Sequence, residues 1–228
     1  MSDFATLSDA FASDEFWQII ALSLTVSLSA TVLATAAGLP LGAALAVWRF
    51  PGRGPIVLAA NALFGLPPVV VGLVLYLLLS HSGPLGFLGL LFTPGAMILA
   101  QTALALPIVT ALTHRAAAER WSEYGDALMD LGASRLHAMP AVLAMARLPL
   151  LTAVLAGFGR TVSEVGAIIV VGGNIASYTR TMTTAIVLET SKGNLPLALG
   201  LGMVLIGVSV MVSAAAFTLA GRQSWLGR

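Results

Sequence analysis

The sequence of 228 residues contains no cysteine and a single lysine, and only 9% of its residues are charged. Without cysteine the chain forms neither disulfide bonds nor thiolate metal sites. The one lysine, Lys192, stands in Ser191-Lys192-Gly193 and not in the G-K-[ST] sequence of a phosphate-binding loop, so this chain does not hydrolyse ATP by that route. A net charge of +1 argues against a nucleic-acid binder.

The sequence also lacks the residues that two further kinds of chemistry require. Neither a serine nucleophile elbow nor an H-E-x-x-H motif is present, which argues against a hydrolase within the membrane. His81, His114 and His137 fall in three separate connections without the spacing of metal ligands. We therefore expect no catalytic residues and no metal site.

Apolar residues dominate what is present. They make up 58% of the chain, and only 9% of its residues are charged. A soluble domain carries about 25% charged residues. Continuous apolar runs are long enough to cross a membrane as helices and lack the alternation of a β-barrel. The sequence predicts an all-α integral membrane protein of one domain without repeats. The five expected spans cover approximately residues 17–47, 56–79, 96–113, 149–171 and 195–219.

Interruptions are expected in two of these spans. Gly38-Leu39-Pro40 predicts a kink in the first. Pro67-Pro68 breaks the hydrogen-bond ladder of the second, and the freed carbonyl groups must face protein or water, either as part of a pathway or as a packing kink. Residues 182–189 are apolar but too few to cross, which predicts an outer-side or re-entrant helix.

Basic residues predict the orientation. Eight arginines fall in the odd-numbered connections and at the C-terminus, against Arg180 and Lys192 on the other side. Because basic residues accumulate on the cytoplasmic side, residues 1–16 are expected outside and the tail 221–228 inside. Residues 1–15 also lack the basic start of a signal peptide. The eight are Arg49, Arg53, Arg115, Arg120, Arg135, Arg147, Arg222 and Arg228.

One cytoplasmic connection, about residues 114–148, is polar and helical. Apolar residues Trp121, Tyr124, Leu128 and Leu131 recur at helical spacing, and four acidic residues line the opposite face. Gly132 ends this helix, and Ser134 caps the next one. Such a hairpin is typical of a docking surface. The alternative is a helix lying on the membrane surface, but such helices carry basic residues, and this one carries Glu119, Glu123, Asp126 and Asp130.

Two charges lie inside the fourth span. Arg160 and Glu164 are four residues apart, which places them on one helical face. Unpaired, each would cost about 2.5 to 3.5 kcal/mol at the centre of the bilayer, so we expect the pair to face protein or a water-filled path. An ion pair fixing the helix and a pathway role are both open. Arg180 and the hydroxyl groups of Thr179, Thr181, Thr183 and Thr184 are donors suited to a tetrahedral dianion, although threonines in outer loops are commonly only solvated.

Several motifs resemble those of a known family. The hairpin residues Asp126-Ala127-Leu128, Gly132-Ala133-Ser134 and Val142 resemble the cytoplasmic loop signature of ABC-importer permeases, with Asp126 for Glu, Leu128 for Ala, and Ala144-Met145 for Leu-Pro. Four later segments are similar to the permeases of tungstate ABC importers, with molybdate permeases as the nearest relatives. These segments are residues 156–160, 163–167, 172–175 and 179–186.

The resemblance runs over about residues 17–220 and implies a type I importer fold. It implies a non-enzymatic permease homodimer in the inner membrane, two cytoplasmic ATPase subunits that bring ATP and Mg, and an extracytoplasmic binding protein. The cargo would be tungstate, or alternatively molybdate or another anion. The coupling residues would be Glu123, Asp126, Ala127, Leu128, Gly132, Ala133 and Ser134. The pathway residues would be Arg160, Ser163, Glu164, Asn174, Thr179, Thr181 and Thr184.

Two rival classes fit the sequence less well. An ion-coupled secondary transporter usually shows inverted repeats with helices broken at matching positions, and no internal similarity is visible here. A membrane assembly factor without transport activity would not require an acidic docking hairpin. The hairpin therefore favours the ABC permease over both.

Overall fold

The computed structural model describes residues 11–226, with side chains described up to Thr218. The predicted outer segment 1–16 and tail 221–228 lie partly outside these residues. All regular elements in the described range are helices. In chain order they are α2 (Asp14–Val47), α3 (Arg53–Ala62), η1 (Leu63–Gly65), α4 (Pro68–Leu79), η2 (Gly86–Leu88), α5 (Pro94–Asp130), α6 (Arg135–Met145), α7 (Arg147–Val162), α8 (Gly166–Gly172), α9 (Met182–Ser191) and α10 (Leu195–Leu226).

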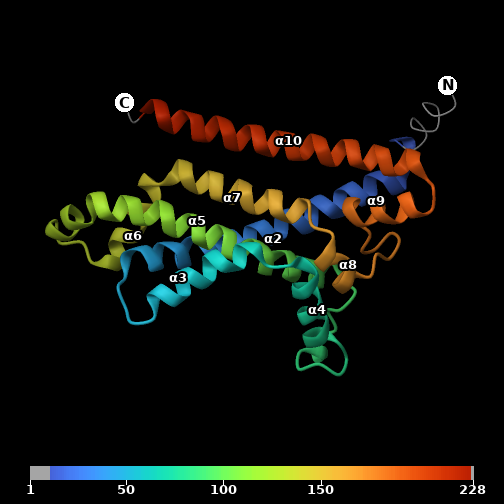
Figure 1. Ribbon diagram of the computed structural model, residues 1–228, viewed down its shortest axis with the longest axis horizontal. Helices are drawn as coiled ribbons and strands as arrows, with labels where there is room; N and C mark the ends of the chain where they lie inside the picture. The colour runs from blue at the N-terminus through green and yellow to red at the C-terminus, as the bar shows by residue number, and fades with distance from the viewer. Residues whose placement is uncertain (1–10, 227–228) are drawn as a thin grey trace.

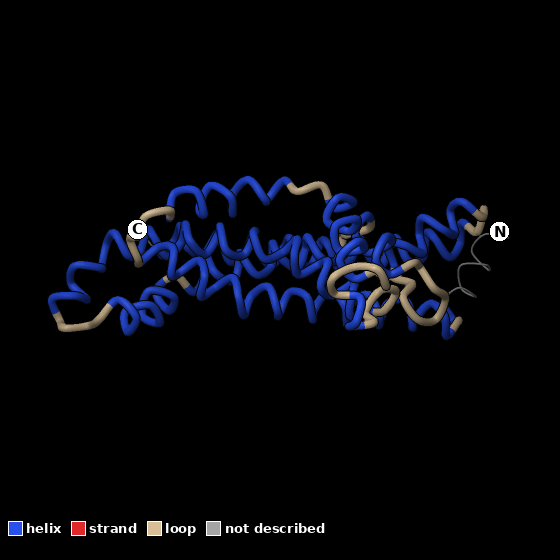
Figure 2. Tube along the Cα trace, turned by 90° about the horizontal axis from the view of Figure 1, so that it is seen from below, coloured by secondary structure: helices blue, strands red, loops and turns tan. Residues whose placement is uncertain are grey.

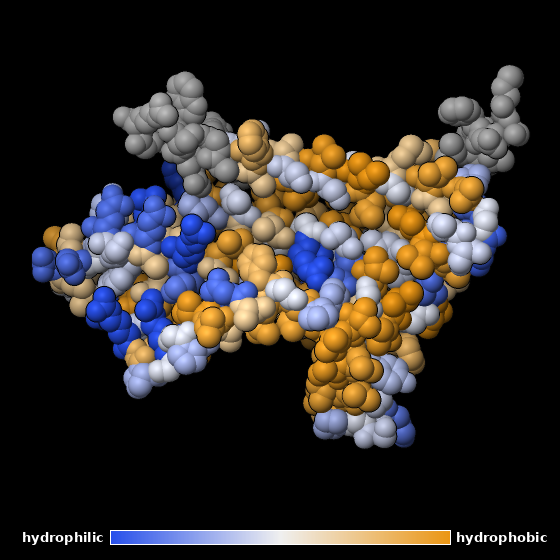
Figure 3. All heavy atoms as spheres, viewed as in Figure 1, coloured by the Kyte–Doolittle hydropathy of each residue, from blue (hydrophilic) through white to orange (hydrophobic). Residues whose placement is uncertain are grey.

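Four long helices, α2, α5, α7 and α10, lie along the long axis of the molecule, and α4 projects across them (Figure 1). In the perpendicular view helices again run along the long axis (Figure 2), and α2 packs against α5, α5 against α7, and α7 against α10. Hydrophilic residues gather at the end formed by α5 and α6, while an apolar surface covers α4 and much of α10 (Figure 3). The molecule is thus a bundle with one polar end.

The helices α2 and α5 form the centre of the bundle because small residues let their backbones approach. A Cβ at Gly42 would lie 2.6 Å from Thr113 Cβ, and one at Gly38 would lie 2.8 Å from Val109 Cγ1. α2 continues as one helix through Pro40 to Val47, so the helix is not interrupted at residues 38–40, and the kink expected there stays a prediction. Gly38 serves close packing between the two helices and does not interrupt α2.

The predicted second span is two helices. α3 and α4 meet at an angle of 106° across the turn that ends at Pro67. Pro68 begins α4, where the lost backbone donor costs nothing because the first turn of a helix leaves its N–H groups unpaired. The two prolines therefore redirect the chain within the expected span 56–79, at the break that the sequence predicts.

The third span and the first helix of the hairpin are one element. α5 runs without interruption from Pro94 to Asp130 and includes Pro107. We expected a span over residues 96–113 followed by a separate polar helix. The structure replaces these with a single helix of 37 residues, which links the hairpin to the centre of the bundle.

The predicted fourth span, residues 149–171, is also interrupted. α7 ends at Val162, and α8 starts at Gly166 after a short non-helical link. At its other end α7 meets α6 at 78°. The link holds Ser163 and Glu164, so the candidate transport residues lie at a helix break and not on the face of a continuous helix.

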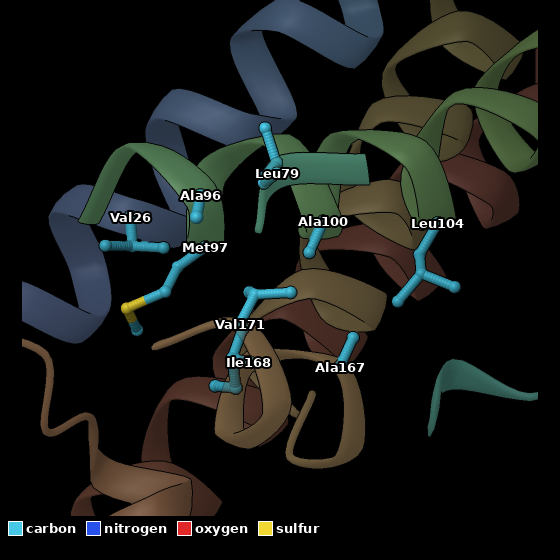
Figure 4. Packing of buried hydrophobic residues seen from close by; sticks show 9 residues of the cluster. All are labelled: Val26, Leu79, Ala96, Met97, Ala100, Leu104, Ala167, Ile168 and Val171. Atoms are coloured by element: carbon cyan, nitrogen blue, oxygen red, sulfur yellow. The ribbon is translucent and has the colours of Figure 1, made fainter. Parts of the chain in front are cut away.

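A buried apolar cluster holds α4 and α8 against α2 and α5 (Figure 4). A Cβ at Gly72 would lie 2.8 Å from Ala167 Cα, so α4 and α8 are in backbone contact there. The cluster comprises Val26, Leu79, Ala96, Met97, Ala100, Leu104, Ala167, Ile168 and Val171. It anchors both interrupted segments to the central pair.

In the described residues, three helices are long and apolar enough to cross a membrane, and the number rises to five if each bent pair is one span. The three are α2, α5 and the part of α10 up to Thr218. The apolar window of α10 is only 17% buried, so most of this helix faces lipid or a partner. α9 has 10 residues and is too short to cross, as expected from the sequence.

Candidate functional site

The corner of the hairpin has the backbone predicted from the sequence. Gly132 has φ +83°, and its N–H donates to Met129 O at 2.9 Å, while Ala133 N–H donates to Leu128 O at 3.1 Å. These two bonds close the end of α5 in the pattern typical of a left-handed glycine cap. Ser134 Oγ then accepts the N–H of His137 and caps α6.

The acidic face of the hairpin is open to solvent, as predicted. Glu119, Glu123, Asp126 and Asp130 are all exposed. Arg120 Nη1 binds Glu123 Oε2 at 2.8 Å, which neutralises one of the four charges. Glu123 also raises the pKa of Tyr124, first through a side-chain hydrogen bond and then through its charge. The hairpin thus keeps a negative surface.

The opposite face is only partly buried. Trp121 and Leu128 pack against a small core formed by Ala46, Ala117 and Val142. Leu131 instead is 85% exposed, and Leu136, on the other side of the corner, is 61% exposed. Assigning Leu131 to the inner face was wrong, because the chain leaves the helix at that residue. The corner therefore carries an exposed apolar tip, a feature that helical spacing alone did not identify.

The sequence analysis also missed two arginines that bind the end of α2. Arg135 Nη1 donates to Val47 O at 2.7 Å and lies 6.0 Å from the centre of the Trp121 ring. Arg53 donates from Nε to Leu45 O. Cations are favourable at a helix C-terminus because the last carbonyl groups lack partners. Arg135 follows the hairpin corner directly, so the hairpin holds α2 as well as α5.

The predicted ion pair between Arg160 and Glu164 is present, at 3.0 Å between Nη1 and Oε2. Glu164 is 2% exposed and Arg160 is 28% exposed. Glu164 has a further role, because its Oε1 accepts the N–H of Ala167 at 2.9 Å and so caps the start of α8. Its carbonyl oxygen accepts the hydroxyl of Thr183 at 2.7 Å. The pair therefore fixes the helix break.

Ser163 is exposed beside this pair. Its hydroxyl donates to Gly159 O at 2.8 Å, and it lines an open groove of about 580 Å³ between the end of α7 and α10. Ser209 and Ser213 line the same groove. Sequence reasoning did not identify these two serines, although hydroxyl groups four residues apart in an apolar helix mark one polar stripe. The groove therefore opens at Ser163, the residue next to Glu164.

The threonines predicted to offer donors are bound internally. Thr179 Oγ1 donates to Gly172 O at 2.6 Å and accepts the N–H of Ile175 at 2.9 Å. Thr181 and Thr184 form a reciprocal cap at the start of α9. All three are at most 3% exposed, so their hydroxyl groups face protein partners, and the alternative of solvated loop residues is wrong for them. Their place in the pathway stays a prediction.

Asn174 lies in the turn after α8 with φ +51°. Its Nδ2 lies 3.5 Å from Thr184 O, and its Oδ1 is buried without a hydrogen-bond partner among the described residues. Among the described residues, Asn174 forms no hydrogen bond with Arg160 or Ser163. The predicted pathway residues therefore form two groups, one at the break and one around the start of α9.

Comparison with known proteins gives the class of the chain. No family model matches it. A probable anion ABC transporter permease protein of Haloferax volcanii is 42% identical over 201 residues, which are 86% of this chain and 87% of that protein. The chain therefore belongs to the ABC transporter permease family. It is a multi-pass membrane protein and a transport subunit, in agreement with its apolar helices.

Two further relatives narrow the comparison. The tungstate uptake system permease protein TupB of Peptoclostridium acidaminophilum is 38% identical over 205 residues, which are 90% of each chain. The protein of the same name from Campylobacter jejuni is 42% identical over 151 residues, which are 66% of this chain and 63% of that one. The family resemblance expected from the hairpin and from the motifs of residues 156–186 is confirmed.

Proposed function

We propose that this chain is the permease subunit of an ABC importer that carries tungstate into the cytoplasm. The observation that carries the proposal is the 38% identity to a tungstate uptake permease over 90% of both chains. The second tungstate permease, at 42% identity, favours the same cargo over the molybdate alternative. An ion-coupled transporter is not favoured by any of these relatives.

The proposal includes partners that the family implies. Two copies of the permease would enclose the path in a type I arrangement, an extracytoplasmic binding protein would deliver the anion, and two ATPase subunits would hold ATP and Mg. The hairpin supports the ATPase contact, because it combines four exposed acids with the exposed leucines 131 and 136 at the Gly132 corner. Glu123, Asp126, Ala127, Leu128, Gly132, Ala133 and Ser134 would form this contact.

In this proposal, residues 17–220 form the transmembrane domain with five crossings in the inner membrane. The bent pair α3–α4 would count as one crossing, and α7 would be the crossing that follows the cytoplasmic hairpin, to which α6 belongs. The N-terminal end of α2 would then lie outside and the hairpin inside, as the distribution of arginines predicts. Arg160, Ser163 and Glu164 would line the path at the helix break, with Asn174, Thr179, Thr181 and Thr184 supporting its outer end.

The proposed orientation predicts a labelling pattern. Ser191 and Ser122 are both exposed serines that donate to the carbonyl three residues before, at 2.6 and 2.8 Å. Because the chain has no cysteine, a cysteine introduced at either position is the only thiol in the protein. Ser191→Cys should react with an impermeant reagent in whole cells, and Ser122→Cys should react only after the membrane is opened. The reverse pattern would contradict the orientation.

Transport itself is tested by uptake into vesicles that contain the permease, its ATPase and its binding protein. Tungstate should accumulate only with ATP inside, because in the proposed importer the ATPase subunits drive the transport. A Walker-A lysine variant of the ATPase is the matched control and should abolish uptake. Accumulation driven by an ion gradient without ATP would contradict the proposal, as would uptake of molybdate with tungstate excluded.

A further inference from the structure

A cavity of about 320 Å³ lies where the start of α2 meets the segment that leads into α9. It is separate from the hairpin and from the groove at Ser163. Its lining brings together residues that are about 160 positions apart in the chain. These residues are Glu15, Gln18, Ile19, Ala21, Leu22, Ser177, Tyr178 and Arg180.

Arg180 is the charged residue best buried in this cavity. Its side chain is 12% exposed, and its Nη1 binds Glu15 Oε1 at 3.0 Å. Its Nε is buried and has no hydrogen-bond partner among the described residues. A guanidinium group carries five N–H donors in a planar fork and is always charged. Because Nε is buried, the donors of Arg180 that a ligand in the cavity can meet are its terminal nitrogens, of which Nη1 holds Glu15.

The other polar side chains of the lining can also donate. Gln18 carries an amide, and Ser177 and Tyr178 carry hydroxyl groups. Ser177 is held at φ +57°, a backbone conformation that is uncommon for residues other than glycine. Glu15 is the acceptor in the lining that opposes them. The lining therefore combines Arg180, three polar side chains that can donate and one carboxylate with the apolar side chains of Ile19, Ala21 and Leu22.

Two further charged groups, Glu189 and Lys192, bear on the electrostatics of the cavity. Glu189 on α9 is close enough for Arg180 to affect its titration. Burial raises the pKa of Glu189, but hydrogen bonds from Lys192 and Asn194, at 2.9 Å each, outweigh burial and lower it. Its negative charge is thus matched by Lys192, which leaves Glu15 as the carboxylate bound to Arg180.

We propose that this cavity binds a tetrahedral oxyanion with two negative charges, with Arg180 as the main donor and Glu15 as the group that the anion displaces. Glu15 is 49% exposed and can turn toward solvent, whereas Arg180 stays in the wall. The carboxylate of this ion pair is exposed, which weakens the pair, and a guanidinium binds two oxyanion oxygens through two charge-assisted bonds, so a dianion competes well with one carboxylate. The choice of tungstate as ligand rests on the proposed function.

The test is equilibrium dialysis of the purified full-length permease against tungstate, without the binding protein, with the bound metal counted by elemental analysis. Arg180→Gln should reduce binding at least tenfold. Glu15→Gln should bind about three- to tenfold tighter, because it removes the competing carboxylate. Arg49→Gln is the matched control, since Arg49 is exposed just beyond the opposite end of α2, and it should bind as the unaltered chain does.

Unchanged binding in Arg180→Gln, or weaker binding in Glu15→Gln, would overturn the inference. If Arg180→Gln does not fold, Glu15→Gln decides alone, because tighter binding requires the displacement. If the transporter imports tungstate but the purified permease binds none, this site is rejected and the proposed function stands. Binding that follows the expected order in a transporter that imports no tungstate would reject the function and keep the site.

Discussion

Replacing Arg160 with alanine is expected to reduce the amount of folded permease more than any other single change described for this chain. The substitution leaves the Glu164 carboxylate, which is 2% exposed, with the Ala167 N–H as its remaining partner. Removing one partner of a buried ion pair costs about 3–5 kcal/mol, because an uncompensated charge stays in a medium of low dielectric constant. We expect the lower end of that range, since Arg160 itself is partly open.

Glu164→Ala should reduce the amount of folded protein less than Arg160→Ala does, and for a different reason. The remaining Arg160 is 28% exposed and can turn toward the open groove, but α8 loses the cap that Glu164 provides. The double substitution removes both charges and should give more folded protein than Arg160→Ala alone. Abundance in the membrane and thermal unfolding in detergent measure this order.

The matched control is Arg120→Ala, which breaks a pair of the same kind on the hairpin surface. Arg120 and Glu123 are 31% and 49% exposed, and such exposed pairs contribute about 1 kcal/mol or less. Normal abundance of Arg160→Ala would show that the Glu164 side chain reaches water by itself. A double variant that folds but does not import tungstate would assign the pair to the path, and a fully active one would leave it a structural role only.

The sequence predicted the features that depend on local chemistry. Gly132 and Ser134 end one helix and start the next because a left-handed glycine and a hydroxyl cap act within a few residues of the chain. The break between α7 and α8 could not be predicted in the same way. At the break Thr183 donates its hydroxyl to the carbonyl of Glu164 from 19 positions away, a contact that no local pattern indicates. The hydropathy of this segment predicts a continuous span, because the apolar residues Val162 and Val165 flank the break.

The candidate site was predicted in part for the same reason. The spacing of Arg160 and Glu164 was sufficient to indicate an ion pair, since neighbours on one turn meet wherever the chain is close to helical. The threonines could be identified as donors but not as bound donors, because their acceptors, such as Gly172 O, come from other elements. The contact between Arg135 and Val47 O spans 88 positions and leaves no periodic signal.

Gly132→Val is expected to separate the permease from its ATPase while leaving the membrane domain folded. Gly132 has φ +83°, and no atom lies within 4 Å of the place that a Cβ would take, so the penalty is in the backbone and not in packing. A residue with a Cβ pays about 1–2 kcal/mol in this conformation, and a β-branched one pays more. The turn should therefore open and lose the bond from Ala133 N–H to Leu128 O.

Opening the turn moves the apolar tip at Leu131 and Leu136, which the proposed ATPase contact requires. A loss of about 1.4 kcal/mol in that contact corresponds to a tenfold weaker association, so co-purification of the ATPase should fall by about that factor and tungstate uptake with it. Gly132→Asn is the matched control, because asparagine tolerates a positive φ and should keep most of the association. Since the corner lies beyond the buried core of α5 and Gly132 is exposed, membrane abundance should stay unchanged in both variants. A valine variant that retains the ATPase and imports at the normal rate would show that the hairpin does not seat the ATPase through this corner.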